Sequence, residues 1–225
     1  MDNLNEMFSK AISPVSPRSR IYRTLYDTQD FCSRQTLARD CGLSLPTVHQ
    51  YLTDLFQHGL VRYSGEDLAT GGRRAQGLEI VPDARIALGI SVTGHHLRLS
   101  AVDLRLKELA YCLESFDLAS HLNLFDGALA GIIEKFLDDF HLNRSRLLGV
   151  GITIPGLISP DGQRITNAPT LAIRDAPLYP LTRGINYPVH VETTLLPAGM
   201  RRAPFAAKRG IWPIYLLSMD SGALF

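Results

Sequence analysis

Cysteine is scarce in this sequence: it has three, Cys32, Cys41 and Cys112, and no CxxC pair. An odd number at wide spacing leaves at least one thiol outside any disulfide, and it does not match a cysteine-rich zinc site. The seven histidines do not predict a metal site either. His95 and His96 are adjacent, so in a strand their side chains would point to opposite faces and could not bind one ion together. We therefore expect no metal, no cofactor and a reduced, cytoplasmic setting.

Long apolar runs are also missing. No stretch approaches the roughly 20 apolar residues that a helix needs to span a bilayer. The N-terminus lacks the basic-then-apolar order of a secretion signal. Residues 1–17 contain Ser13-Pro14 and Ser16-Pro17, which interrupt any long helix, so this segment is expected to be an N-terminal tether. We expect no association with a membrane.

An excess of charge of one sign is lacking as well. The formal net charge is +1, and residues 1–80 contain nine Lys or Arg against nine Asp or Glu. A nucleic-acid partner would therefore be bound through local placement of arginines and not through a bulk field. One DNA-binding module of this kind would bind weakly, so we expect a homodimer, in which the contributions of two modules to the affinity add together. The arginines concerned are Arg34, Arg39, Arg62, Arg73 and Arg74.

The strongest positive signal lies in residues 33–51, SRQTLARDCGLSLPTVHQY, which predict two short helices. Ser33 can cap the first helix and Ser44 the second, because each hydroxyl can accept from an amide of the first turn. Gly42, in the corner between the helices, can adopt the positive φ that such a corner requires. Two capped helices joined by a tight corner are typical of a helix-turn-helix DNA reader.

The second of these helices has two faces. Val48 and Tyr51, three residues apart, fall on the inner face, which leaves the outer face free to meet bases. The amide of Gln50 can pair with adenine in the major groove. Ser44 and Thr47 can donate to phosphate where the helix dipole also favours negative charge. The predicted DNA contacts of the two helices are Arg34, Ser44, Pro46, Thr47, His49, Gln50 and Thr53.

A wing is expected next. Residues 61–64 and 78–81 predict two short strands, and the polar loop between them contains the sequence GGRR. Its glycines let the backbone lie near phosphate, and Arg73 and Arg74 suit a phosphate or a narrow minor groove. We assign residues 18–82 to a winged helix-turn-helix DNA-binding domain. The alternative is a helical hairpin used for packing, with a solvated loop.

The chain changes character after residue 82. Residues 84–92, ARIALGISV, form a near-continuous apolar run of the kind found in buried strands. Further strands and one amphipathic helix follow, in an order that favours an α/β lobe on a partly parallel sheet. The predicted elements are strands at 84–92, 96–102, 108–116, 147–153 and 189–191 and a helix at 122–140.

Four sequence blocks carry a family resemblance: LARDCGLSLPTVHQYLTDLFQHGLVR, the wing GGRR, LGISV followed by LRLSAVDL, and GVGITIPGLISPDGQRITNAP. Over about residues 18–198 the chain resembles transcriptional regulators of the ROK family. The resemblance implies a winged helix-turn-helix followed by an actin-like, ribonuclease H-like sugar-kinase domain of two lobes. It places the first lobe at residues 83–205 and the start of the second at 206–225.

The chain departs from the sugar kinases of this family at polar positions. Their Asp-x-Gly phosphate loop corresponds to Ser91-Val92-Thr93 here, and their Glu-Asn-Asp motif, which holds the general base, corresponds to Glu192-Thr193-Thr194. The pKa of a threonine hydroxyl is far too high for it to accept a proton from a sugar alcohol at neutral pH. We therefore expect no enzyme and no catalytic residue. The ligand-binding positions that the resemblance leaves are Gly156, Thr170, Glu192, Thr193 and Thr194.

The resemblance also predicts more chain than is present. A second lobe, opened by a Gly-Thr-Gly phosphate loop, would follow about residue 210, and the family's zinc motif of histidine and cysteine would lie within it. The sequence ends at Phe225. We expect an incomplete lobe, a fragment or truncated regulator, and no structural zinc.

Three functions remain open at this point. The first is a transcriptional regulator, a repressor of carbohydrate-metabolism genes that binds an operator in double-stranded DNA and responds to a sugar or sugar phosphate. The second is a ROK-type sugar kinase. The third is a truncated remnant that binds DNA without sensing a ligand.

Overall fold

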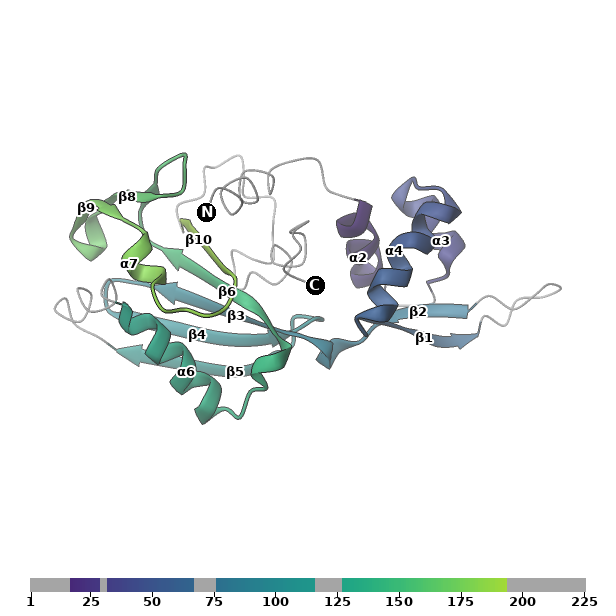
Figure 1. The fold of residues 1–225 in the computed structure, drawn as a ribbon, viewed down its shortest axis with the longest axis horizontal. Helices are drawn as coiled ribbons and strands as arrows, with labels where there is room; N and C mark the ends of the chain where they lie inside the picture. The colour runs from purple at the N-terminus through teal and green to yellow at the C-terminus, as the bar shows by residue number, and fades with distance from the viewer. Residues whose placement is uncertain (1–16, 29–31, 67–75, 116–126, 194–225) are drawn as a thin grey trace.

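The computed structural model of the protein describes residues 17–28, 32–66, 76–115 and 127–193. These form two bodies side by side, a winged helix made by residues 17–80 and an α/β lobe made by residues 86–193 (Figure 1). The loop with Arg73 and Arg74, residue Thr194 and the expected second lobe at 206–225 lie outside the described residues.

The winged helix consists of three helices and a two-stranded antiparallel hairpin. The helices are α2 (Pro17–Asp27), α3 (Arg34–Cys41) and α4 (Leu45–Gln57), and the strands are β1 (Val61–Glu66) and β2 (Gln76–Ile80). Their apolar faces meet in one core, as the 3.6-residue periodicity of the helices requires. The largest fully buried side chains that these helices and strands and the segment between α4 and β1 give to the core are Ile21, Leu25, Leu37, Leu52, Leu60 and Ile80.

The α/β lobe is built on a five-stranded sheet with the order β10-β6-β3-β4-β5. β3 (Ile86–Val92), β4 (His96–Asp103) and β5 (Glu108–Ser115) form an antiparallel meander. β6 (Leu147–Ile154) pairs parallel to β3, and β10 (Val189–Thr193) pairs parallel to β6. This confirms the partly parallel α/β sheet that the sequence predicts.

Helix α6 (Leu129–Asp139) covers one face of this sheet. Its buried Leu129, Ile133 and Phe136 pack against alternate residues of the strands, such as Ile90 and Ile152. The sequence predicts a longer helix, from 122 to 140. The described part begins at Leu129 and ends at Asp139, and residues 116–126 are outside the described ranges.

A second, three-stranded sheet lies between β6 and β10 in the chain. It has the order β7-β8-β9, with β7 (Leu157–Ile158), β8 (Arg164–Ala168) and β9 (Ile173–Pro177). Gly162 N–H donates to the Ser159 carbonyl at 2.8 Å, which closes the turn between β7 and β8. Neither β9 nor the short helix α7 (Tyr179–Thr182) is predicted from the sequence, because neither has a clear apolar period.

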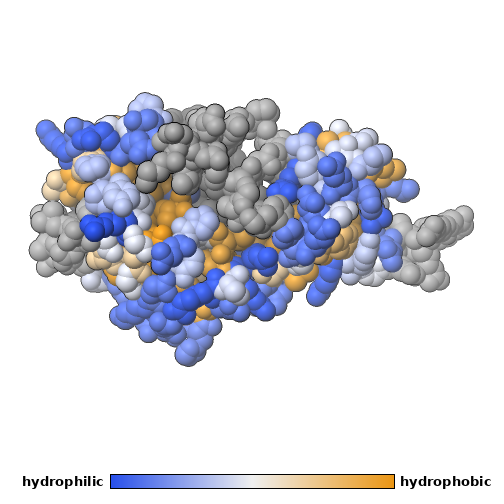
Figure 2. Space-filling model, in the orientation of Figure 1, coloured by the Kyte–Doolittle hydropathy of each residue, from blue (hydrophilic) through white to orange (hydrophobic). Residues whose placement is uncertain are grey.

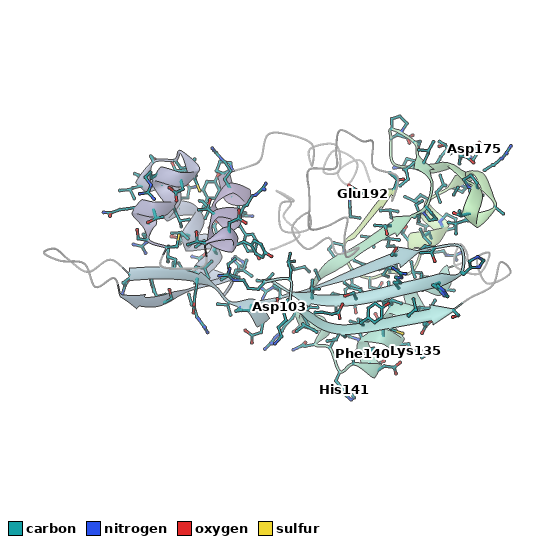
Figure 3. The ribbon with its side chains drawn as sticks, turned by 180° about the vertical axis from the view of Figure 1, so that it is seen from behind. Asp103, Lys135, Phe140, His141, Asp175 and Glu192 are labelled. Atoms are coloured by element: carbon teal, nitrogen blue, oxygen red, sulfur yellow. The ribbon has the colours of Figure 1, made fainter. Side chains whose placement is uncertain are left out.

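The two bodies share part of one core. Leu104, in the turn after β4, is only 1% exposed and belongs to the hydrophobic cluster of the winged helix. The hydroxyl of Tyr22 on α2 donates to the Leu104 carbonyl at 2.7 Å, and Arg105 donates to the Tyr26 carbonyl at 2.9 Å. Asp103 stiffens the turn, because its carboxylate accepts from the backbone N–H of Arg105 at 2.8 Å and of Lys107 at 2.9 Å (Figure 3). The sheet lobe therefore supplies a side chain that the winged-helix core needs.

Replacing Tyr22 by phenylalanine should cost about 1 kcal/mol of unfolding free energy, because the buried Leu104 carbonyl loses its donor. Burial raises the pKa of the Tyr22 phenol well above its ordinary value, so the folded protein holds that proton at a pH where the unfolded chain releases it. The wild type should accordingly lose stability as the pH rises above about 10, and the variant should lose less. Urea unfolding at pH 7 and at pH 10.5 measures both effects. Equal stability losses for the two proteins would contradict the buried hydrogen bond.

Candidate nucleic-acid interface

Helices α3 and α4 begin after the predicted caps Ser33 and Ser44, α3 ends at the predicted corner at Gly42, and α4 continues to Gln57. The Ser33 hydroxyl accepts from Thr36 N–H at 3.1 Å, and the Ser44 hydroxyl accepts from Thr47 N–H at 3.3 Å. Gly42 ends α3 with φ of 62°, a left-handed conformation that favours glycine. Its N–H and that of Leu43 satisfy carbonyls of the last turn of α3. The tight corner fixes α4 against α3.

The two faces of α4 differ as expected. Val48, Leu52 and Leu55 are buried in the core, and Tyr51 is half-buried. The predicted DNA-contacting side chains lie on the remaining surface, where a duplex can reach them. The exposed ones are Ser44, Pro46, His49, Gln50 and Thr53, and Thr47 is half-buried.

Several hydroxyls on this surface already have partners within the protein. Ser44 Oγ and Thr47 Oγ1 lie 2.8 Å apart and share a hydrogen bond. Thr53 donates its hydroxyl to the His49 carbonyl at 2.9 Å. These contacts stiffen the first two turns of α4 and restrict what the hydroxyls can offer a ligand.

The arginines near α3 and the hairpin are engaged in contacts that the sequence did not reveal. Arg34 donates to the Tyr63 hydroxyl at 2.5 Å, and its guanidinium carbon lies 5.7 Å from the centre of that ring. Arg39 pairs with Asp40 at 2.8 Å, and this hydrogen bond raises the pKa of the guanidinium above its ordinary value. Arg62 pairs with Glu79 at 2.5 Å across the hairpin. The carboxylates therefore partly cancel the positive field of Arg39 and Arg62, and the Tyr63 contact holds Arg34 in place without cancelling its charge.

Tyr63 joins the three parts of the winged helix. Its ring centre lies 4.7 Å from that of Phe56 on α4, and Arg34 reaches it from α3. Tyr63 is also 45% exposed, so it sets the base of the hairpin and remains accessible. This role of Tyr63 is not predictable from the sequence, since a tyrosine in a short strand does not show which helices will contact it.

The ligand-binding residues that the resemblance implies lie around the carboxyl ends of β6 and β10. Thr193 donates its hydroxyl to the Gly156 carbonyl, and Thr170 donates to the Pro155 carbonyl at 3.4 Å. Glu192 lies 3.1 Å from His190 on the same face of β10. The structure thus brings Gly156 and Thr193 into direct contact, and Thr194 is outside the described ranges.

One further residue belongs to this region. Thr153 on β6 lies beside Ser91 of β3 and Glu192 of β10 in the parallel register, so the three side chains share a sheet face. Thr153 is 3% exposed, and its hydroxyl has no hydrogen-bond partner among the described residues. From the sequence, Thr153 is predicted only to belong to a buried strand.

Gly156 is a position where a side chain does not fit. A Cβ atom there would lie 2.6 Å from Ala168 Cβ and 2.7 Å from the Asn167 carbonyl oxygen. We expect Gly156→Ala to lower the unfolding free energy by about 1–3 kcal/mol through overpacking. Gly131→Ala is the control, because nothing lies within 4 Å of a Cβ there, and alanine favours its helix. Thermal unfolding measures both, and a Gly156→Ala midpoint at or above that of Gly131→Ala would contradict the close contact.

No group of three or more His, Cys, Asp or Glu side chains among the described residues could hold a metal ion. No helix in the described ranges is long and apolar enough to cross a membrane.

Comparison with known proteins gives three kinds of similarity. Residues 28–65 match the sequence family described as the IclR helix-turn-helix domain. The chain is 28% identical over 158 residues to the DNA-binding transcriptional dual regulator NagC of Escherichia coli K12, covering 69% of this chain and 38% of that protein. It is 26% identical over 196 residues to the xylose repressor of Bacillus subtilis 168, covering 84% of this chain and 49% of the repressor.

A solved structure shares the fold. The crystal structure of a ROK family transcriptional regulator, a homologue of the E. coli MLC protein, superimposes with a TM-score of 0.60 at 19% identity. The match covers 79% of this chain and 45% of that one. The chain thus shares the fold of part of that regulator, is homologous to NagC and the xylose repressor, and spans less than half the length of these relatives.

Proposed function

We propose that this homologue of sugar repressors is itself a DNA-binding transcriptional repressor, which reads a duplex operator with α4 and responds to a sugar or sugar phosphate. The observation that carries the proposal is the division of α4 into a buried apolar face and an exposed polar face. His49 and Gln50 lie at the centre of the exposed face, and the core holds the helix rigidly behind them. A rigid helix with a free polar face suits insertion into the major groove.

We further propose that the protein binds DNA as a homodimer. Arg39 and Arg62 are paired with carboxylates of the same protein, and the net charge of the chain is only +1. One winged helix then makes few phosphate contacts, so its affinity for DNA is low. A homodimer presents two α4 helices to half-sites about 34–36 Å apart and adds their contributions. Arg73 and Arg74 are proposed to reach phosphate or the minor groove from the loop between β1 and β2.

We propose an effector site at the carboxyl ends of the parallel strands, where α/β sheets bind ligands. Hydroxyl and carboxylate groups of Thr153 and Glu192 can bond to sugar hydroxyls. Strand β4 runs from this end of the sheet to Leu104 in the winged-helix core, which gives an effector a direct structural route to α4. The site residues proposed from the family resemblance are Gly156, Thr170, Glu192, Thr193 and Thr194.

We propose no enzymatic activity. The position expected for a general base carries Thr194, and the neighbouring Thr193 donates its hydroxyl to the Gly156 carbonyl. A threonine hydroxyl cannot serve as a base at neutral pH.

The proposal is tested by selecting duplexes from a random-sequence library with the full chain and measuring affinity by fluorescence anisotropy at several salt concentrations. We expect a defined sequence to be enriched, with affinity that falls as salt rises. A panel of sugars and sugar phosphates should then shift both that affinity and the melting temperature. No enrichment would refute DNA reading. Enrichment without any ligand response would support the non-sensing remnant, and ATP consumption with a hexose panel would identify a kinase.

A further inference from the structure

Leu45 is the first residue of α4 and is 49% exposed, whereas Val48 and Leu52 of the same helix are completely buried. A single exposed leucine on a protein surface is ordinary. Leu45 is notable because of its position: it lies in the first turn of α4, the part of the helix that the proposed function directs at the bases. Among the described residues of the winged helix, the other large exposed hydrophobic side chain is Tyr63, which is held by Phe56 and Arg34.

Leu45 shares a row with the polar residues of the outer face. Residues four apart stand above one another on a helix, so Leu45, His49 and Thr53 form one exposed ridge. A helical side chain leans toward the N-terminus, which places the leucine at the leading end of that ridge. The next residue, Pro46, is also exposed and apolar.

The polar groups around Leu45 are occupied. Ser44 caps the helix, and its hydroxyl shares a hydrogen bond with that of Thr47 at 2.8 Å. The leading end of α4 therefore presents apolar surface with a rigid polar frame behind it. In the major groove one base carries an apolar group at its edge, the 5-methyl group of thymine.

We infer that Leu45 is a specificity residue that contacts a thymine methyl group in each half-site of the operator. The inference rests on the proposed DNA-reading function and adds to it a base and the chemical group recognised. Binding covers the leucine and the methyl group together, so each gains from the removal of water.

Deoxyuridine in place of thymidine removes the methyl group and keeps every hydrogen-bonding group of the base. The probe is the duplex selected by the full chain, with each thymine replaced in turn by uracil. For the wild type, replacement at one position of a half-site should weaken binding about fourfold, the value of burying one methyl-sized group. For Leu45→Ala, thymine and uracil at that position should bind equally. Leu45→Met keeps an apolar side chain of similar length and should retain the discrimination.

Leu113→Ala is the matched control, because Leu113 is 47% exposed on β5, away from α4, and it should retain the wild-type ratio. A Leu45→Ala protein that still discriminates thymine from uracil, or a wild type indifferent to uracil at every position, would overturn the assignment while leaving DNA reading intact. Failure to select any duplex would refute both proposals. Leu45 is exposed, so circular dichroism of Leu45→Ala should match the wild type.

Discussion

Leu104→Ala is expected to lower the free energy of unfolding by about 2–5 kcal/mol, the range measured when a buried leucine is truncated. Leu104 is 1% exposed and fills the winged-helix core from the turn after β4. The cavity would therefore open inside one body through a change in the other. Urea unfolding followed by far-ultraviolet circular dichroism measures the loss.

The same variant tests whether the two bodies unfold together. Leu148 at the start of β6 also packs against the hydrophobic cluster of the winged helix. Arg146, two residues earlier, forms an ion pair with Asp83, its Nη1 lying 3.7 Å from Asp83 Oδ2. We expect hydrogen exchange to accelerate in both α2 and β4 of Leu104→Ala. Leu113→Ala removes an exposed leucine of the same sheet and should change stability by less than about 0.5 kcal/mol. Faster exchange confined to β4 would show that the winged helix folds without its neighbour.

Gln50→Ala should reduce discrimination between the selected duplex and one altered at a single base pair by about 1–3 kcal/mol, or roughly 5- to 150-fold. Gln50 is exposed at the centre of the outer face of α4, and its amide can donate and accept at an adenine edge. Loss of that pair relaxes specificity at one position and leaves phosphate contacts in place. Anisotropy titrations against single-base variants of the duplex measure it.

The double variant Arg73→Ala/Arg74→Ala should behave differently. Phosphate contacts carry no sequence information, so we expect weaker binding to every duplex and a shallower dependence on salt. Arg174→Ala, which removes an exposed arginine from β9 in the other body, is the control and should leave both quantities unchanged. If Gln50→Ala and the double variant had the same effect on every duplex, the assignment of base-reading and phosphate-binding roles would be wrong.

The parts of the structure that were predictable from sequence depend on near neighbours in the chain. Ser33, Gly42 and Ser44 act within four residues of their own positions, so their caps and corner could be predicted. The buried stripe of α4 follows from the helix period in the same way. Strand β3 could be predicted as well, because its near-continuous apolar run is typical of a buried strand.

The features that were missed depend on contacts between distant residues. Tyr22 and Leu104 are 82 positions apart, and Arg34 and Tyr63 are 29 apart. No local pattern reveals that Leu104, in a turn of the α/β lobe, completes the core of the winged helix. Nor does one reveal that Arg34, a predicted DNA contact, is held by Tyr63. Thr153 was missed for a related reason, since the strand register that places it between Ser91 and Glu192 is known only from the folded sheet.

The central claim is that the outer face of α4 meets duplex DNA, and site-specific photo-crosslinking tests it most directly. A benzophenone side chain placed at position 50 should crosslink the selected duplex, and one at position 113 on β5 should not. Excess unlabelled duplex should suppress the crosslink at position 50. Crosslinking from position 113 with none from position 50 would contradict the account.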